Sequence, residues 1–236
     1  MEELRVLHDV AGPDADTEMA AARALLDEVA AGRSPATLRV YRPLGPTVAF
    51  GRVDTLRSGY ADAVAAARRA GFDTAVRVCG GRAVAYDPTC LVLDHVAPDD
   101  GSPLDSRTQE RFWSFASLYA EALSELGVDA RVGPVPDEYC PGPYSVNAGR
   151  RVKLVGTAQR VARGAWLFST VLIVTGPARL RRVLGPVYAA IDMPFDPATV
   201  GSVSDEVPGT TTADVQRVVL EAYAKRYRLQ DSPGGV

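Results

Sequence analysis

The stretch RVKLVGTAQ, residues 151–159, decides the fold and the chemistry predicted for this 236-residue chain. Its residues alternate, so Val152 and Leu154 fall on one face of a predicted strand and Lys153 on the other. The chain has 26 basic residues, yet only Lys153 and Lys225 are lysine. An amine is compact and titrates more readily than a guanidinium, which favours Lys153 as an amine held in a pocket. A surface lysine on an edge strand is the alternative.

A second stretch, RVCGGRAV at residues 77–84, lies between two predicted strands. Gly80 and Gly81 allow backbone N–H groups to approach a ligand closely, and Arg77 and Arg82 would hold a negative or polar group there. A tight hairpin turn explains the glycine pair equally well. The stretch is neither a dinucleotide-binding fingerprint nor a Walker loop.

The chain has three cysteines at no metal-binding spacing and only two histidines, so we expect free thiols and no metal site. Cys79 and Cys90 lie in apolar strands, as core cysteines do. Cys140 lies in a Pro/Gly-rich loop, residues 138–144, and Lys153 follows soon after. A nucleophilic thiol needs access and a nearby cation, so these two residues are the candidate catalytic pair. The alternative is an incidental free cysteine.

Composition places the chain among globular proteins and excludes several function classes. Apolar residues make up 47% and charged residues 23%, which excludes a disordered chain and a small disulfide scaffold. The net charge of −3 disfavours nucleic acid as a partner. The longest apolar run, residues 165–174, is too short to span a membrane, and no signal peptide is recognisable. We therefore expect a cytoplasmic protein that does not bind membranes.

Hydrophobic periodicity predicts an α+β protein with a mixed, mostly antiparallel sheet flanked by helices. We expect one domain over residues 1–230, a disordered tail over 231–236 and no C-terminal accessory domain. A capping box at Ser106 and Gln109 is expected to open a long helix. The predicted strands are residues 4–10, 37–42, 47–51, 74–78, 83–86, 90–96, 152–156 and 166–174. The other predicted helices begin after residue 14 or cover residues 61–70, 177–184 and 213–228.

The order of four segments resembles the lipoate–protein ligase A and octanoyltransferase family, whose fold is shared with the biotin protein ligase catalytic domain. The segments are TLRVY (residues 37–41), VAFGR (48–52), CGGRAV (79–84) and KLVGTAQ (153–159). The resemblance covers residues 5–228. It implies a catalytic pair of Cys140 and Lys153 and a set of substrate-binding residues. These are Arg77, Cys79, Gly80, Gly81, Arg82, Tyr86, Gly156, Thr157 and Ala158.

Within this family, the position of the cysteine separates the reaction types. One transferase type carries its nucleophile after the lysine strand, but no cysteine follows Cys140 here. A second type carries it in the loop before that strand, followed by a proline and a tyrosine, as Pro143 and Tyr144 follow here. ATP-dependent ligases favour a small residue where this chain has Arg82. The resemblance therefore implies an octanoyl or lipoyl transferase that works through a Cys140 thioester.

The resemblance also implies partners. The donor would be an acyl carrier protein or a lipoylated protein, and the acceptor a lysine of a lipoyl domain or a glycine-cleavage H protein. No cofactor is expected. ATP and magnesium would be needed only by the first alternative, a ligase that uses a separate accessory chain. The second alternative is a degenerate protein that binds lipoyl or acyl groups without turnover.

Four positions depart from the family pattern. Val76 stands in place of an arginine, Cys79 in place of a serine or threonine, and Tyr86 and Ser169 in place of histidines. We expect all four to line the acyl or adenylate pocket. They leave open whether the acyl group is octanoyl or lipoyl.

Overall fold

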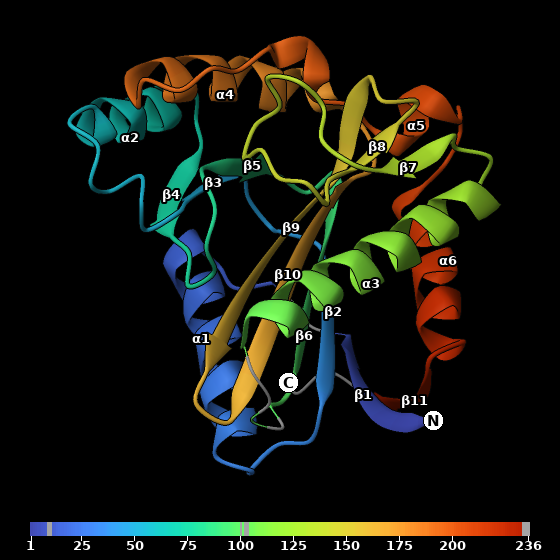
Figure 1. The fold of residues 1–236 in the computed structure, drawn as a ribbon. Helices are drawn as coiled ribbons and strands as arrows, with labels where there is room; N and C mark the ends of the chain where they lie inside the picture. The colour runs from blue at the N-terminus through green and yellow to red at the C-terminus, as the bar shows by residue number, and fades with distance from the viewer. Residues whose placement is uncertain (9–10, 100, 102–103, 233–236) are drawn as a thin grey trace.

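The computed structural model describes residues 1–8, 11–99, 101 and 104–232 (Figure 1). It is built on an eight-stranded sheet with strand order β11-β1-β2-β6-β10-β9-β8-β7. The pairs β11–β1 and β1–β2 are parallel and the remaining pairs are antiparallel, which confirms the predicted mixed sheet. Its strands are β1 (Glu2–His8), β2 (Thr37–Tyr41), β6 (Cys90–Pro98), β7 (Ala130–Val132), β8 (Val146–Ala148), β9 (Val152–Ala162), β10 (Ala165–Ile173) and β11 (Tyr227–Ser232).

A second sheet has three strands, β3 (Thr47–Phe50), β4 (Asp73–Val76) and β5 (Val84–Tyr86). β3 lies in the middle, parallel to β4 and antiparallel to β5. The connection from β4 to β5 carries the glycine pair of residues 80 and 81. This connection lies against β9, because Gly80 N donates to the Gln159 carbonyl.

Helices cover both faces of the large sheet. α3 (Leu104–Glu125) and α6 (Thr212–Ala224) pack against each other on one face, and α1 (Ala15–Ala30) packs on β6 and β10 from the other. α2 (Tyr60–Arg69) and α4 (Pro177–Ala190) pack together over the small sheet. The remaining helical elements are a 3-10 turn (Pro197–Thr199) and α5 (Val203–Glu206). None of the helices within the described residues has the length and hydropathy of a membrane span.

Strand β6 shows why this sequence builds a two-sided core. Leu91 and Leu93 point into the cluster under α3 and α6, whereas Val92 joins the cluster around the small sheet. All three side chains are buried. Each buried aliphatic side chain contributes roughly 1.5–3 kcal/mol. An apolar strand without polar alternation is therefore what a sheet covered on both faces requires.

Several sequence expectations at element ends are wrong. β9 runs to Ala162 and not to residue 156, and α4 runs to Ala190 and not to residue 184. The last helix ends at Ala224 instead of residue 228, and β11 follows it. Asp231 and Ser232, which we expected in a disordered tail, belong to β11, while residues 233–236 lie outside the described part. α3 already begins at Leu104, so Ser106 lies inside its first turn and not at its N-cap.

Candidate active site

The loop of residues 138–145 between β7 and β8 carries Cys140. The Cys140 φ angle is 42°, in the left-handed region that residues other than glycine rarely adopt. Its main-chain N–H donates to the hydroxyl of Tyr188 on α4, and that hydroxyl donates to the Ala83 carbonyl at 2.9 Å. The strained conformation is thus held from outside the loop. Such strain persists where surrounding structure fixes it, often at functional sites.

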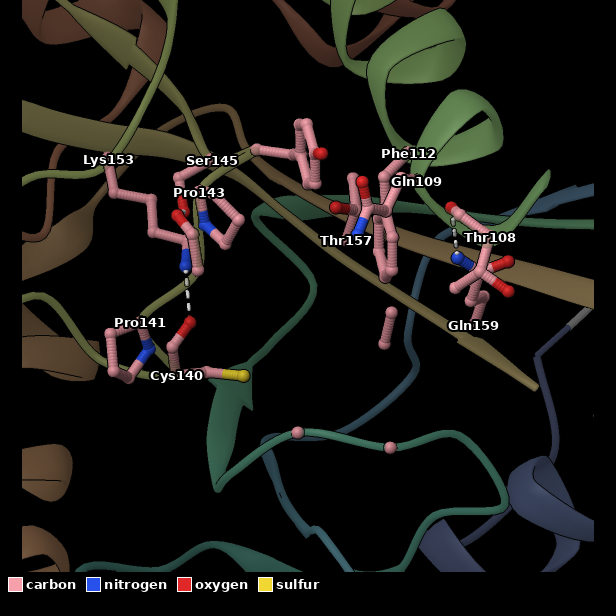
Figure 2. A pocket seen from close by; sticks show the side chains of 15 residues that line it. Thr108, Gln109, Phe112, Cys140, Pro141, Pro143, Ser145, Lys153, Thr157 and Gln159 are labelled. Carbon is pink, nitrogen blue, oxygen red and sulfur yellow. Dashed lines mark hydrogen bonds between the residues drawn. The ribbon is translucent and has the colours of Figure 1, made fainter. Parts of the chain in front are cut away.

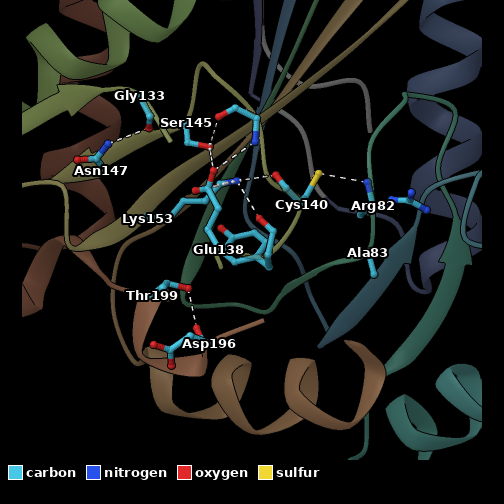
Figure 3. A network of polar contacts seen from close by, with 12 residues as sticks. Arg82, Ala83, Gly133, Glu138, Cys140, Ser145, Asn147, Lys153, Asp196 and Thr199 are labelled. Carbon is cyan, nitrogen blue, oxygen red and sulfur yellow. Dashed lines mark hydrogen bonds and ion pairs between the residues drawn. The ribbon is translucent and has the colours of Figure 1, made fainter. Parts of the chain in front are cut away.

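Two donors hold the Cys140 sulfur. Sγ accepts from the backbone N–H of Arg82, with N 3.2 Å away (Figure 3). It also accepts from Nη2 of Arg77 at 3.4 Å. Burial alone would raise the pKa of this thiol. The charges of Arg77 and Lys153 and the two hydrogen bonds outweigh burial, so the net pKa lies below its ordinary value. The site therefore favours the thiolate, which is the nucleophilic form.

Lys153 on β9 reaches the same loop, but from the carbonyl side. Nζ donates to the Tyr139 carbonyl at 3.0 Å and to the Cys140 carbonyl at 2.9 Å, and the side chain is only 2% exposed. β9 is an inner strand of the sheet, so the edge-strand alternative for Lys153 is wrong. Burial lowers the pKa of Lys153, against the opposing charges of Cys140 and Glu138.

Glu138 is a buried member of the site that sequence reasoning missed. Its Oε2 lies 3.5 Å from Lys153 Nζ, and its Oε1 accepts from Ser145 Oγ at 2.8 Å and from the Gly142 N–H at 3.2 Å (Figure 3). The carboxylate therefore closes the loop on itself and balances the charge of Lys153. The acidic residue two positions before the cysteine was the available signal.

The loop that carries Gly80 and Gly81 lies in direct contact with Cys140. A Cβ at Gly81 would lie 2.8 Å from the Cys140 sulfur and 2.5 Å from Nη2 of Arg77, and Gly81 has a φ of 91°. Any side chain there would displace the groups that hold the sulfur. Gly80 N donates to the Gln159 carbonyl at 3.4 Å, which joins the loop to β9. Close approach to Cys140 thus explains Gly81, whereas a Cβ at Gly80 would meet only the Gln159 carbonyl, at 4.0 Å.

Arg82 contributes its backbone and not its guanidinium. Its Nη1 lies 3.3 Å from Oδ1 of the fully buried Asp54, whose other oxygen accepts from the Gly51 N–H. Arg77 Nη2 donates to the Arg82 carbonyl at 2.7 Å and so orders the same turn. The Arg82 side chain does not line the cavity beside Cys140.

A cavity of about 530 Å³ opens beside the sulfur (Figure 2). Phe112 of α3 and Tyr144 of the cysteine loop stack in it with ring centroids 5.6 Å apart. Figure 2 shows Cys140 and Lys153 on one side and residues of α3 on the other. Six predicted site residues line it, namely Gly80, Gly81, Cys140, Lys153, Thr157 and Ala158. The lining residues that sequence reasoning missed include Thr108, Gln109, Phe112, Ser145 and Gln159.

The remaining predicted residues lie elsewhere. Gly156 faces the Lys153 stem and the Tyr139 hydroxyl, at 3.5 and 3.7 Å from the position of a Cβ. Cys79, Tyr86 and Ser169 line a separate cavity of about 30 Å³ behind Arg77, while Val76 is exposed in a surface groove. The four departures from the family pattern therefore do not line the cavity beside Cys140.

The other two cysteines are built as core residues. Cys79 and Cys90 are at most 3% exposed, and burial raises the pKa of each to about 12. At neutral pH both remain protonated and shielded. Among the described residues, no group of three or more histidines, cysteines and carboxylates is placed to hold a metal ion.

Comparison with known proteins shows which proteins share this architecture. A family model described as the lipoyl protein ligase A/B catalytic domain matches residues 14–224. Octanoyltransferase LipM of Moorella thermoacetica is 26% identical, over 98% of this chain and 89% of the relative. A crystal structure of lipoate-protein ligase A bound with ATP has a TM-score of 0.77 at 22% identity, over 100% of this chain and 90% of the other.

A bi-partite lipoate protein ligase from Thermoplasma acidophilum, described together with its E2 lipoyl domain, is also similar. Its TM-score is 0.69 at 20% identity, over 100% of this chain and 88% of that one. At these identities the solved structures establish the fold, and the matched family model covers most of the chain. The chain therefore belongs to the lipoyl protein ligase A/B catalytic domain family.

Proposed function

We propose that this chain transfers an octanoyl or lipoyl group to a lysine of a lipoyl domain or glycine-cleavage H protein, through a thioester on Cys140. The carrying observation is the Cys140 sulfur, held by Arg77 and the Arg82 N–H at the wall of the large cavity. The similarity to an octanoyltransferase of the LipM type supports the same reaction class. As a family member the chain is a transferase of lipoate attachment.

In the first step, the Cys140 thiolate attacks the carbonyl carbon of the donor thioester. A new S–C bond forms, the bond from the carbonyl carbon to the donor sulfur breaks, and the donor leaves as a thiol after taking up a proton. With a lipoylated protein as donor, the thiolate attacks the amide carbonyl carbon, the C–N bond breaks, and the donor leaves as its lysine amine after taking up a proton. The Arg77 guanidinium and the Arg82 N–H lie beside the reacting sulfur and stabilise the charge that moves onto the carbonyl oxygen. Lys153 keeps the loop in place through its two carbonyl contacts.

In the second step, the neutral amine of the target lysine attacks the acyl-enzyme. An amide bond forms, the Cys140 thiolate leaves, and the amine loses the proton that balances the one gained by the donor thiol. A thioester already carries the free energy that an amide needs, so the reaction requires no ATP. The stacked rings of Phe112 and Tyr144 offer the cavity an apolar wall for an acyl chain.

Mass spectrometry of the intact protein tests this proposal. The protein is mixed with octanoyl-loaded acyl carrier protein, and separately with a lipoylated H protein, without ATP. We expect a mass increase of one acyl group, located on Cys140 and released by addition of an unmodified lipoyl domain. Cys140→Ser is expected to keep the fold and lose the adduct.

Two outcomes would contradict the proposal. Lipoate-dependent exchange of pyrophosphate into ATP by the isolated chain, with normal transfer by Cys140→Ser, would establish the ligase alternative. Acyl-group binding without adduct formation or transfer would establish the degenerate binding protein.

A further inference from the structure

A second hollow, which we call the arginine groove, lies on the other side of the glycine loop from the large cavity. Its volume is about 400 Å³, and its lining includes the side chains of Arg23, Arg52, Arg77 and Arg160 and no carboxylate. The chain as a whole carries a net charge of −3. A concentration of arginines in one groove of an acidic protein indicates a site for an anion.

The groove arginines are incompletely neutralised. Arg23 is paired with Asp27 at 3.0 Å, but Arg52 is exposed and makes no ion pair among the described residues. The Nε atoms of Arg77 and Arg160 are buried without a hydrogen-bond partner in the described structure. Arg160 Nη1 donates to the Val78 carbonyl at 3.3 Å, which fixes the position of its guanidinium. The exposed Arg52 guanidinium has no carboxylate partner among the described residues, so a ligand that supplies acceptor oxygens would be favoured in the groove.

The groove adjoins the nucleophile. Gly80 and Gln159 line both the groove and the large cavity, and their backbones are joined by a 3.4 Å hydrogen bond. Arg77 lines the groove and also donates to the Cys140 sulfur. An elongated ligand could therefore lie in the groove and pass its far end over this rim to Cys140. Val76 and Val78 give the groove an apolar part beside its charged one.

We propose that the arginine groove binds the phosphate of a 4′-phosphopantetheine thioester, the chemical group shared by acyl carrier proteins and coenzyme A. A phosphate offers several acceptor oxygens to guanidinium groups, and the arm between phosphate and sulfur is elongated and partly apolar. Arg52 and Arg160 bind the phosphate, and the arm delivers the acyl thioester to Cys140. The inference rests on the proposed function, and it selects a phosphopantetheine donor over a lipoylated protein.

Single-turnover acylation of Cys140 tests the groove, with four donors that differ only beyond the thioester arm. They are octanoyl-pantetheine, octanoyl-4′-phosphopantetheine, octanoyl-coenzyme A and octanoyl-loaded acyl carrier protein. At subsaturating concentrations we expect the three phosphorylated donors to react about 10-fold faster or more than octanoyl-pantetheine, as one charge-assisted contact allows. Arg52→Gln and Arg160→Gln are each expected to reduce this preference, and the double variant to abolish it.

Octanoyl-pantetheine should react at the same rate with all of these variants, because it has no phosphate. Arg68→Gln, on the exposed face of α2, is the matched control and should leave every rate unchanged. Equal rates for phosphorylated and unphosphorylated donors would overturn the inference. An effect of Arg52 and Arg160 confined to the carrier protein would also overturn it, since it would place these arginines against the carrier's protein surface.

Direct binding separates this inference from the proposed function. 4′-Phosphopantetheine is titrated calorimetrically into Cys140→Ser, with and without Arg52→Gln and Arg160→Gln. Binding that the two substitutions weaken about 10-fold supports the groove even if no donor acylates Cys140. Acylation of Cys140 together with undetectable phosphopantetheine binding would refute the proposed role of the arginine groove. The proposed transferase function would still hold.

Discussion

At the scale of single residues, Arg77 is the side-chain cation in contact with the nucleophilic sulfur. Its charge comes first among the influences that lower the pKa of Cys140. Arg77→Gln is therefore expected to raise this pKa, so that the thiolate fraction at pH 7 falls. The pH dependence of Cys140 alkylation by iodoacetamide, followed by intact mass, measures this as a midpoint at higher pH. An unmoved midpoint would assign the low pKa to the backbone and Lys153.

The two lysines are expected to differ in whether they tolerate replacement by arginine. Its ammonium fits between two carbonyls and a buried carboxylate, whereas Lys225 is exposed and paired with Glu125. A larger, planar guanidinium at position 153 would push the cysteine loop away, and a displacement of about 1 Å can cost roughly 100-fold in rate. We expect Lys153→Arg to lose acyl transfer by about this factor and Lys225→Arg to be silent. Similar rates for both variants would contradict the assigned role of Lys153.

The sequence was sufficient to predict Cys140 and Lys153 as one site, because they are only 13 residues apart along the chain. It could not predict that Lys153 binds the loop carbonyls while Arg77 binds the sulfur. That division depends on how the glycine loop, far away in sequence, packs on residue 140. Asp54 was equally hidden, because nothing local shows that its carboxylate holds the Arg82 side chain away from the cavity.

At the scale of elements, Tyr188 is the link between α4, the cysteine loop and the beginning of β5. Its hydroxyl accepts from the Cys140 N–H and donates to the Ala83 carbonyl. Tyr188→Phe leaves both partners without this bond in a buried place, at a cost of about 1–3 kcal/mol. We expect that loss of stability in urea denaturation and slower acylation, because Cys140 leaves its left-handed conformation.

Tyr119→Phe is the matched control for this prediction. The Tyr119 hydroxyl is also buried and pairs with that of Tyr223 at 3.0 Å, between α3 and α6. This variant should lose stability by a similar amount and acylate normally. If both variants slow acylation equally, the effect of Tyr188 is one of general stability and not of positioning.

The predicted elements were mostly correct where periodicity was local and strong. α1 begins at Ala15, directly after residue 14 as predicted, and the Asp14 side chain caps it by accepting from Thr17 N. β11 was missed because its side chains alternate between exposed and half-buried and are largely polar, so periodicity within the segment is weak. Its strand conformation comes from parallel pairing with β1, at the opposite end of the chain. Pairing between the two ends of a chain leaves no local pattern.

At the scale of the whole molecule, His95 lies where four elements meet. The centroid of its ring lies 4.8–5.7 Å from the ring centroids of four aromatic residues. These are Phe115 on α3, Trp166 on β10, Tyr223 on α6 and Tyr227 on β11. Neither ring nitrogen has a hydrogen-bond partner in the described structure. This convergence makes the histidine a reporter of whether the layers of the fold are assembled.

The protonation of His95 predicts how stability depends on pH. Burial, aided by the charge of Arg111, lowers the pKa of His95 from 6.5 to about 3. Below pH 6.5 the unfolded chain binds a proton here that the folded chain does not. The free energy of unfolding therefore decreases as the pH is lowered below 6.5. One proton gives a slope of about 1.4 kcal/mol per pH unit. Urea denaturation between about pH 5.5 and 4, where nearly one whole proton separates the two states, measures this slope, which His95→Phe should reduce by that amount whatever its absolute stability. A parent slope in His95→Phe would mean that protonation elsewhere opens the fold.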